Sequence, residues 1–126
     1  MSTMPGTELP SDTILESQTI ELAGAAVDST GSTRIQEIIG SEVEIVDVRV
    51  TATAADFNFQ ITVNGSNVYG TAQSPTGTTE QSFFPTGQNA YWANINSAIV
   101  AFDVTSASGT TGATATVDVL TRSHKE

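Results

Sequence analysis

The chain has 126 residues, with 14 aspartates and glutamates against 4 lysines and arginines and a formal net charge of −10. It contains no cysteine and one histidine, His124, which excludes disulfide frameworks, thiol nucleophiles, zinc–thiolate sites and Cys/His catalysis. Nucleic acid is not an expected partner, because phosphate neutralisation needs clustered basic residues and the body of the chain holds only Arg34, Arg49 and Arg122. No apolar run approaches the roughly 20 residues of a membrane-spanning helix, so no membrane partner is expected.

Abundant acids, a single lysine (Lys125) and small apolar residues together are typical of a protein from a high-salt cytoplasm or brine. A dense carboxylate surface repels itself in dilute buffer and is stabilised when salt screens the charges. An ordinary acidic β protein is the alternative interpretation of the same composition. The first residues contain no basic region followed by an apolar stretch, so we expect no signal peptide.

Residues 1–16 contain Pro5, Gly6 and Pro10 among serine, threonine and glutamate, which favours an extended arm over a packed element. Two interpretations stay open, a disordered tail and an arm that becomes ordered on a neighbouring subunit. In the second, Ile14 and Leu15 anchor the arm. We therefore expect an N-terminal arm at 1–16, a β-sandwich domain at 17–122 and a C-terminal tail at 123–126.

The segment 42–53 has the clearest strand pattern in the chain. Val46, Val48 and Val50 share one face, whereas Ile45 has the opposite parity. Because side chains alternate between the two faces of a strand, this change of phase needs an extra residue or a switch of sheet. The sequence therefore predicts a β-bulge near Ile45 and Val46.

The segment 57–69 predicts a β-hairpin. Apolar residues alternate with polar ones as far as Val63, the dipeptide Asn64-Gly65 follows, and Val68 and Tyr69 come next. Alternating apolar residues beside Asn-Gly are the strongest short-range hairpin signal. Asn64-Gly65-Ser66 is also a glycosylation sequon, and the simple turn is the alternative interpretation.

Further strands are expected at 18–27, 33–39, 80–84, 90–94, 97–106 and 113–122. In the last two, the core-facing residues are expected to be Val100, Phe102 and Val104, and Ala115, Val117 and Val119. Eight or nine short antiparallel strands in a chain of this length predict an all-β, two-sheet β-sandwich. The strand order favours a jelly-roll-like arrangement, with an immunoglobulin-like sandwich as the alternative.

Three aspartates, Asp47, Asp103 and Asp118, have outward parity in the middle of expected strands. They could bind Ca²⁺ through carboxylate oxygens, but the D-x-D-x-D-G spacing is missing, and solvated or salt-paired charges are the favoured interpretation, with Arg49 or Arg122 as the partner. No G-x-S-x-G elbow, P-loop or G-x-G-x-x-G motif occurs. The sequence predicts no catalytic, cofactor-binding or metal-binding residue, no cofactor, and a protein that is not an enzyme.

Four aromatic residues flank the Pro-Thr-Gly-Gln-Asn loop: Phe83, Phe84, Tyr91 and Trp92. Adjacent residues of a strand point to opposite faces, so only one of each pair can face the core. The core, a subunit interface and a sugar-stacking platform are the three interpretations of these rings. The second member of each pair is best explained by a subunit interface, so these four residues join Ile14 and Leu15 as candidate interaction residues.

Three stretches carry a resemblance to a known group of proteins: ADFNFQITVNGSNVYGTAQS, FFPTGQNAYW and IVAFDVTSASGTTGATATVDVLT. Their order, a hairpin with Asn-Gly, a Pro-x-x-x-Asn loop, and an F-D-V strand before a V-D-V strand, resembles small β-sandwich structural proteins of tailed viruses. With the acidic, lysine-poor composition, the chain is similar to those of viruses infecting halophilic archaea. The resemblance covers about residues 42–121.

The resemblance implies a capsid-decorating or tail-associated protein, often a trimer with a terminal arm that clamps the shell, and no catalytic residues. The expected function is a non-enzymatic virion protein that binds and stabilises a capsid or tail lattice as a homo-oligomer. Its expected partners are the major capsid or tail protein, and its expected location is the virion, after assembly in the host cytoplasm. A carbohydrate-binding or adhesion module, with Tyr91 or Trp92 as the stacking platform, is the alternative.

Overall fold

The computed structural model describes residues 14–39, 42–85, 91–93 and 97–125, and describes side chains for 17–39, 44–85 and 97–122. Within this part of the chain the elements are strands: β1 (Ile14–Ala26), β2 (Gly31–Ile39), β3 (Glu42–Ala52), β4 (Asn58–Val63), β5 (Ser66–Asn67), β6 (Gln81–Ser82), β7 (Tyr91–Ala93), β8 (Ser97–Ser106) and β9 (Thr114–Lys125). In these described ranges, no helix of a length and hydropathy suited to crossing a membrane was found.

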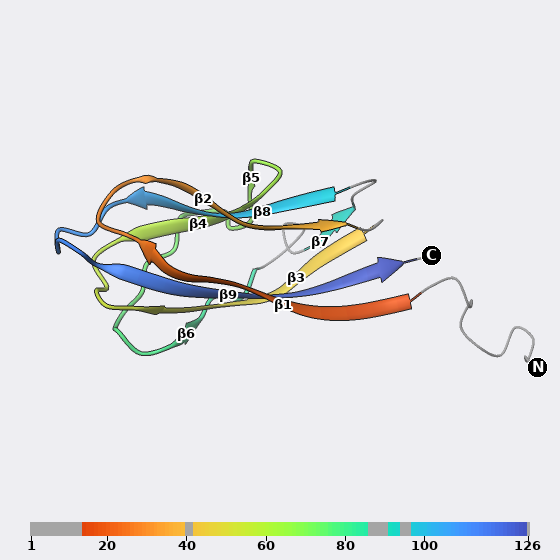
Figure 1. Ribbon diagram of the computed structural model, residues 1–126, viewed down its shortest axis with the longest axis horizontal. Coiled ribbons are helices and arrows are strands. Elements are labelled where there is room, and N and C mark those ends of the chain that lie inside the picture. The colour runs from red at the N-terminus through yellow and green to blue at the C-terminus, as the bar shows by residue number, and fades with distance from the viewer. Residues whose placement is uncertain (1–13, 40–41, 86–90, 94–96, 126) are drawn as a thin grey trace, which may run out of the picture.

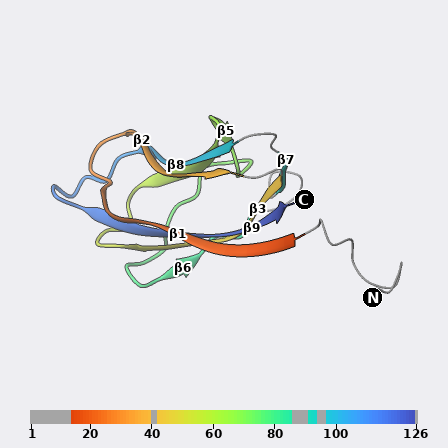
Figure 2. The same cartoon turned by 45° about the vertical axis from the view of Figure 1, so that its right-hand side comes forward.

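The strands form two antiparallel sheets that pack face to face, as Figure 1 shows, and the turned view in Figure 2 keeps the two layers. Sheet A has the order β1-β9-β3-β6, and β7 pairs with β3 beside β6, so β6 and β7 share the fourth position. Sheet B has the order β2-β8-β4-β5. This alternation of strands between two four-membered sheets is the jelly-roll arrangement. The predicted two-sheet, jelly-roll-like sandwich is confirmed.

At both ends of the predicted β-sandwich domain, backbone pairing extends beyond the expected bounds. Strand β1 begins at Ile14, which pairs with Lys125 at the end of β9. Pairing thus reaches beyond the expected bounds of 17 and 122, and the start of β1 and the end of β9 lie at one end of the sandwich (Figure 1). The division into arm, domain and tail stays a prediction.

An aromatic cluster fills the centre of the core between the two sheets. The Phe59 side chain is 0 % exposed, and its ring centroid lies 5.0 Å from that of Phe83, 5.5 Å from that of Phe102 and 6.2 Å from that of Tyr69. The core-facing residues expected on β8 and β9 are buried as well. The inward residues of both sheets therefore form one continuous apolar layer.

The predicted bulge in β3 is confirmed. Ile45 pairs with Thr121 of β9 and Asp47 pairs with Leu120, so Val46 is the extra residue on the β3 side. A bulge places two residues of one strand opposite one residue of its partner and shifts the phase of the side chains. It allows β3 to bury Ile45 and still turn Asp47 to the outer face of sheet A.

The predicted hairpin is confirmed as a two-residue turn between β4 and β5. Asn64 and Gly65 have φ angles of 52° and 87°, and Val63 pairs with Ser66 across the turn. Positive φ at both central residues defines a type I′ turn, whose twist suits a hairpin. The Asn64 side chain is also engaged, because its Oδ1 accepts a hydrogen bond from the Ile99 N–H at 2.9 Å. This bond favours the interpretation as a turn over that as a glycosylation site.

Gly65→Ala is expected to lower the free energy of unfolding by about 1–2 kcal/mol, because a Cβ is disfavoured at its φ of 87°. Gly77→Ala is the matched control, since the φ of Gly77 is not in the left-handed region and a Cβ there would meet no atom within 4 Å. Urea denaturation of both variants measures the difference. Equal stabilities would contradict the type I′ turn.

At the end of the sandwich opposite the chain termini, two carboxylates connect the loops by accepting hydrogen bonds. Asp56, after β3, accepts hydrogen bonds from the Ser108 hydroxyl and from the Gly109 N–H, the latter at 3.0 Å. Asp28, after β1, accepts one from the Gly112 N–H at 2.8 Å. The bonds from Ser108 and Gly109 lower the pKa of Asp56 below its usual value.

This lowered pKa predicts a contribution to acid stability. A carboxyl whose pKa is lower in the folded state stabilises the fold above its unfolded pKa of about 3.9 and loses that contribution as pH falls through its folded pKa. Asp56→Asn is therefore expected to flatten the fall of the melting temperature below about pH 4. Thermal unfolding from pH 7 to pH 2 measures it, and an unchanged pH profile would refute the role of this carboxylate.

Candidate interaction surface

The six candidate residues fall on the edges of a single sheet, sheet A. Ile14 and Leu15 begin β1, Phe83 and Phe84 follow β6, and Tyr91 and Trp92 lie on β7. The pairing Leu15–His124–Glu42–Ala93 joins β1, β9, β3 and β7 in one row, so β7 and the start of β1 share an end of the sheet. Three strand spacings, about 14 Å, separate these two edges. The side chains of Ile14, Leu15, Tyr91 and Trp92 lie outside the described residues.

The Phe83 and Phe84 side chains point to opposite sides, as expected for adjacent residues. Phe83 is 7 % exposed and packs edge-on against Phe59, whereas Phe84 is 64 % exposed. The Phe83 backbone is held on both sides, because its N–H donates to the Val48 carbonyl at 2.7 Å and its carbonyl accepts from the Tyr69 hydroxyl at 2.9 Å. Phe84 is thus presented to the outside from a fixed backbone.

The Tyr69 hydroxyl is suited to its role as a permanent donor. Burial raises the pKa of Tyr69, and the Asp47 carboxylate raises it further. The raised pKa favours the protonated phenol, which is the form that donates to the Phe83 carbonyl. This bond ties the chain after β5 to the chain after β6, next to the exposed Phe84.

Asp47 is salt-paired, as expected, but it is more deeply buried than its outward parity suggested. We expected a solvated or salt-paired charge, and the salt pair exists, with Arg49 Nε 3.1 Å from Asp47 Oδ2. Asp47 is nevertheless only 3 % exposed, although it faces away from the core. Ser82 donates a second hydrogen bond to Oδ2 at 3.3 Å, whereas Oδ1 has no hydrogen-bond partner among the described residues.

The burial of Asp47 follows from its neighbours on both sides. Leu120 of β9 is its pairing partner, and on the other side β6 pairs with β3 through Arg49 and Ser82. The Phe83 N–H, which donates to the Val48 carbonyl, keeps the chain after β6 close to this part of β3. Burial of this kind depends on pairing between distant segments, which parity within one strand does not reveal.

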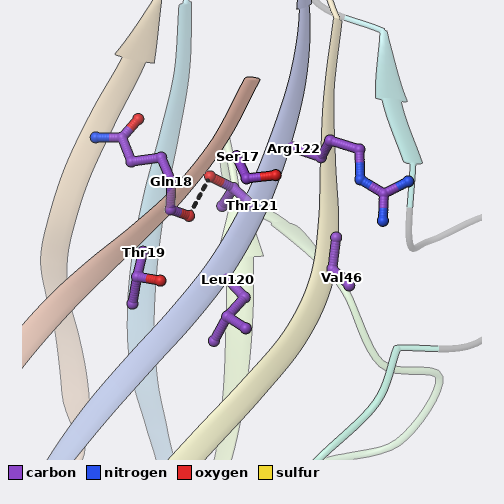
Figure 3. Close-up of a pocket in the computed structure, with 7 residues that line it drawn as sticks. All are labelled: Ser17, Gln18, Thr19, Val46, Leu120, Thr121 and Arg122. Carbon is purple, nitrogen blue, oxygen red and sulfur yellow. Dashed lines mark hydrogen bonds between the residues drawn. The ribbon is translucent and has the colours of Figure 1, made fainter. Parts of the chain in front are cut away.

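A hollow opens on the outer face of sheet A beside the bulge. Its volume is about 190 Å³, and its lining residues, drawn in Figure 3, are Ser17, Gln18, Thr19, Val46, Leu120, Thr121 and Arg122. Leu120 lies between Thr19 of β1 and Val46 of β3, which makes the middle of the hollow apolar (Figure 3). The bulge creates this site by turning Val46 outward beside Leu120.

Polar groups surround the apolar middle of the hollow. The Arg122 guanidinium reaches across β3, where its Nη1 is 3.7 Å from Glu44 Oε1, and the Thr121 hydroxyl donates to the Gln18 carbonyl at 2.9 Å (Figure 3). Apolar side chains beside an arginine and hydroxyl groups suit a protein contact more than a chemical reaction. The sequence held one signal for this site, the outward parity of Leu120 next to the bulge, and the interpretation missed it.

The three aspartates considered for Ca²⁺ are not brought together. Asp47 and Asp118 belong to strands of sheet A, whereas Asp103 belongs to β8 of sheet B. In the described ranges, no group of three or more acidic or histidine residues has the arrangement of a metal site. The alternative of a three-aspartate Ca²⁺ site is therefore wrong.

Comparison with known proteins finds similarity at the level of structure. No protein-family model matches the sequence, and no curated protein matches it. A chain of the solved structure described as "Cyanophage Pam1 capsid asymmetric unit" is similar, with a TM-score of 0.51 and 10 % sequence identity. The match covers 100 % of this chain and 94 % of that chain. The two chains share a fold. At this identity the likeness concerns the arrangement of the strands alone.

Proposed function

We propose that the chain is a non-enzymatic structural protein of a virus particle, which binds other virion proteins in a capsid or tail lattice and stabilises that lattice. The observation that carries the proposal is the jelly-roll fold shared, over the full length of this chain, with a chain of a cyanophage capsid asymmetric unit. Fold likeness is an analogy for function, so the proposal also needs a surface of the right chemistry.

The outer face of sheet A provides such a surface. An exposed phenylalanine, an apolar hollow and two arginines are the groups enriched in protein interfaces. Strand β1, 13 residues long, is the edge strand of sheet A within the described part of the chain, and this edge is a second place where a partner can add hydrogen bonds. Both features support binding to protein partners, for which we propose the major capsid or tail protein and further copies of this chain.

Three finer parts of the proposal rest on the sequence. They are the trimer implied by the resemblance, the assembly role of the arm at 1–16, and a halophilic archaeal host. For the last, the net charge of −10 supports salt adaptation, because screening relieves carboxylate repulsion. A melting temperature unchanged between molar salt and a few tens of millimolar salt would reject this part alone. The carbohydrate-binding alternative, which depends on Tyr91 and Trp92, also stays a prediction.

Quantitative mass spectrometry of virus particles tests the proposed function. Particles are purified on a density gradient from cells that express the chain, and its copy number is measured against the major capsid protein. We expect a fixed, reproducible ratio in the particle fraction. If the chain remains in the soluble fraction while capsid protein sediments, the proposed virion role is wrong.

A further inference from the structure

The turn between β4 and β5 presents an asparagine followed by a glycine on the surface. Asn64 and Gly65 are exposed, and they close the hairpin at the edge of sheet B (Figure 1). An asparagine can lose its side-chain amide when the backbone nitrogen of the next residue attacks its side-chain carbonyl carbon. Glycine permits this attack more readily than other residues do, since no Cβ hinders a close approach to its backbone.

The Asn64 carboxamide is bound to β8 through both of its polar atoms. Its Oδ1 accepts a hydrogen bond from the Ile99 N–H at 2.9 Å, and its Nδ2 donates to the Ser97 carbonyl at 3.3 Å. The Asn64 N–H also donates to the Ile99 carbonyl at 2.9 Å. These bonds continue the ladder between β4 and β8 beyond Val63 and Val100, and the side chain replaces a backbone carbonyl as the acceptor.

We propose that Asn64 is a deamidation site that the fold keeps unreactive while its carboxamide is bound to β8. In the reaction the Gly65 nitrogen bonds to Asn64 Cγ, the bond from Cγ to Nδ2 breaks, and Nδ2 leaves as ammonia with the proton of the Gly65 N–H. Water then opens the cyclic imide and leaves aspartate or isoaspartate at this position. Water is the one co-reactant.

The contact with β8 opposes the first step of this reaction. The carboxamide must rotate until its carbon meets the Gly65 nitrogen, and its two hydrogen bonds to β8 fix the plane of the group. Breaking two hydrogen bonds of ordinary strength lowers the reactive population about tenfold or more. Deamidation of the folded chain therefore follows the local opening of the hairpin, and exposure of Asn64 is not sufficient for it.

The product of the reaction no longer fits the contact with β8. An aspartate can still accept from the Ile99 N–H, but a carboxylate has no proton to donate, so its second oxygen faces the Ser97 carbonyl as an unpaired acceptor. In isoaspartate the main chain runs through the former side chain, which lengthens a turn whose two residues set the hairpin geometry. Deamidation thus loosens the hairpin from β8, and the released ammonia makes the change irreversible.

Peptide mapping by mass spectrometry tests the site. The isolated chain is incubated at mildly alkaline pH, folded in buffer and unfolded in urea, and the replacement of an amide by a hydroxyl is followed with time. Asn67, exposed on the same hairpin but followed by valine, is the internal control. We expect Asn64 to react faster than Asn67 in the unfolded chain, and about tenfold or more slowly in the folded chain than in the unfolded one.

Hydrogen exchange at the Ile99 N–H tests the control by the fold, because this N–H is released when Asn64 Oδ1 moves away. We expect the slowing of deamidation on folding to match the protection of the Ile99 N–H in order of magnitude. Three results would overturn the inference: equal rates in the folded and unfolded chain, no preference for Asn64 over Asn67, and a folded chain that stays unconverted although Ile99 exchanges readily.

Two variants test the loosening of the hairpin separately. Asn64→Asp has the side chain of one product, and Asn67→Asp adds the same charge elsewhere on the hairpin as the matched control. We expect Asn64→Asp to speed exchange at the Ile99 N–H about tenfold and Asn67→Asp to leave it unchanged. Equal protection of Ile99 in both variants would refute the loosening. The site does not depend on the proposed virion role, and either can fail alone.

Discussion

Phe59→Ala is expected to lower the free energy of unfolding by about 3–5 kcal/mol, the cost of removing a large side chain from a packed core. Phe59 is 0 % exposed and touches the rings of Phe57, Tyr69, Phe83 and Phe102, which come from the chain before β4, from the chain beyond β5 and β6, and from β8 of sheet B. Because one ring contacts all of these segments, its loss leaves a cavity that no single neighbour can fill.

Urea denaturation, followed by far-ultraviolet circular dichroism, measures this effect. Phe84→Ala is the matched control, because Phe84 is 64 % exposed, and in dilute protein we expect it to change stability by no more than about 0.5 kcal/mol. Domains of this size are stable by about 5–15 kcal/mol, so Phe59→Ala will remove a large part of the total. A loss below about 1 kcal/mol would mean that the aromatic cluster is not the centre of the core.

Local patterns in the sequence were enough to predict the strands and two of their irregularities. The parity change at Val46 gave the bulge, and Asn64-Gly65 gave the type I′ turn, because both depend on residues that are neighbours along the chain. The same alternation predicted that one of Phe83 and Phe84 faces the core. Which of the two does so depends on the hydrogen bonds of Phe83 to β3 and to Tyr69, and these join distant segments.

The candidate site was predicted less well than the fold because it is made by pairing between strands. The hollow needs β1, β9 and the bulge of β3 in one register, and the burial of Asp47 needs Leu120 on one side and the chain after β6 on the other. Outward parity was right for Asp47, but outward does not mean exposed when neighbouring side chains cover the group. The pattern of charges along one strand does not show whether side chains of other strands bury a charged group.

On sheet B, Gln60 likewise combines outward parity with burial. Its position in β4, between Phe59 and Ile61, gives it outward parity, yet it is only 4 % exposed. Its amide Nε2 donates to the Tyr69 carbonyl at 3.1 Å, and its Oε1 accepts from the Tyr69 N–H at 3.3 Å. The Gln60 side chain therefore bonds to both backbone groups of Tyr69, as a neighbouring strand would. It does so at the point where the chain after β5 leaves the edge of β4.

The main-chain bonds on either side explain why this substitute is needed. The Val68 N–H donates to the Ile61 carbonyl at 2.8 Å, and Gln73 exchanges two backbone hydrogen bonds with Phe59. Between these two anchors the chain bulges away from β4, so Tyr69 cannot reach the β4 backbone. With Gln60 in place, both backbone groups of Tyr69 are satisfied and its ring stays packed on Phe59.

Gln60→Ala is expected to lower the free energy of unfolding by about 2–6 kcal/mol, because two buried backbone groups lose their partners and each costs about 1–3 kcal/mol. Gln73→Ala is the matched control, since the Gln73 amide bonds to the nearby Thr71 carbonyl and to no other group in the described ranges, and a change within about 0.5 kcal/mol is expected. Urea denaturation gives both values, and hydrogen exchange at the Tyr69 N–H locates the defect.

Because the Tyr69 hydroxyl holds Phe83, faster exchange should extend to the Phe83 N–H as well. Equal losses in the two variants, or slow exchange at Tyr69 in Gln60→Ala, would show that this side chain does not hold the bulged segment.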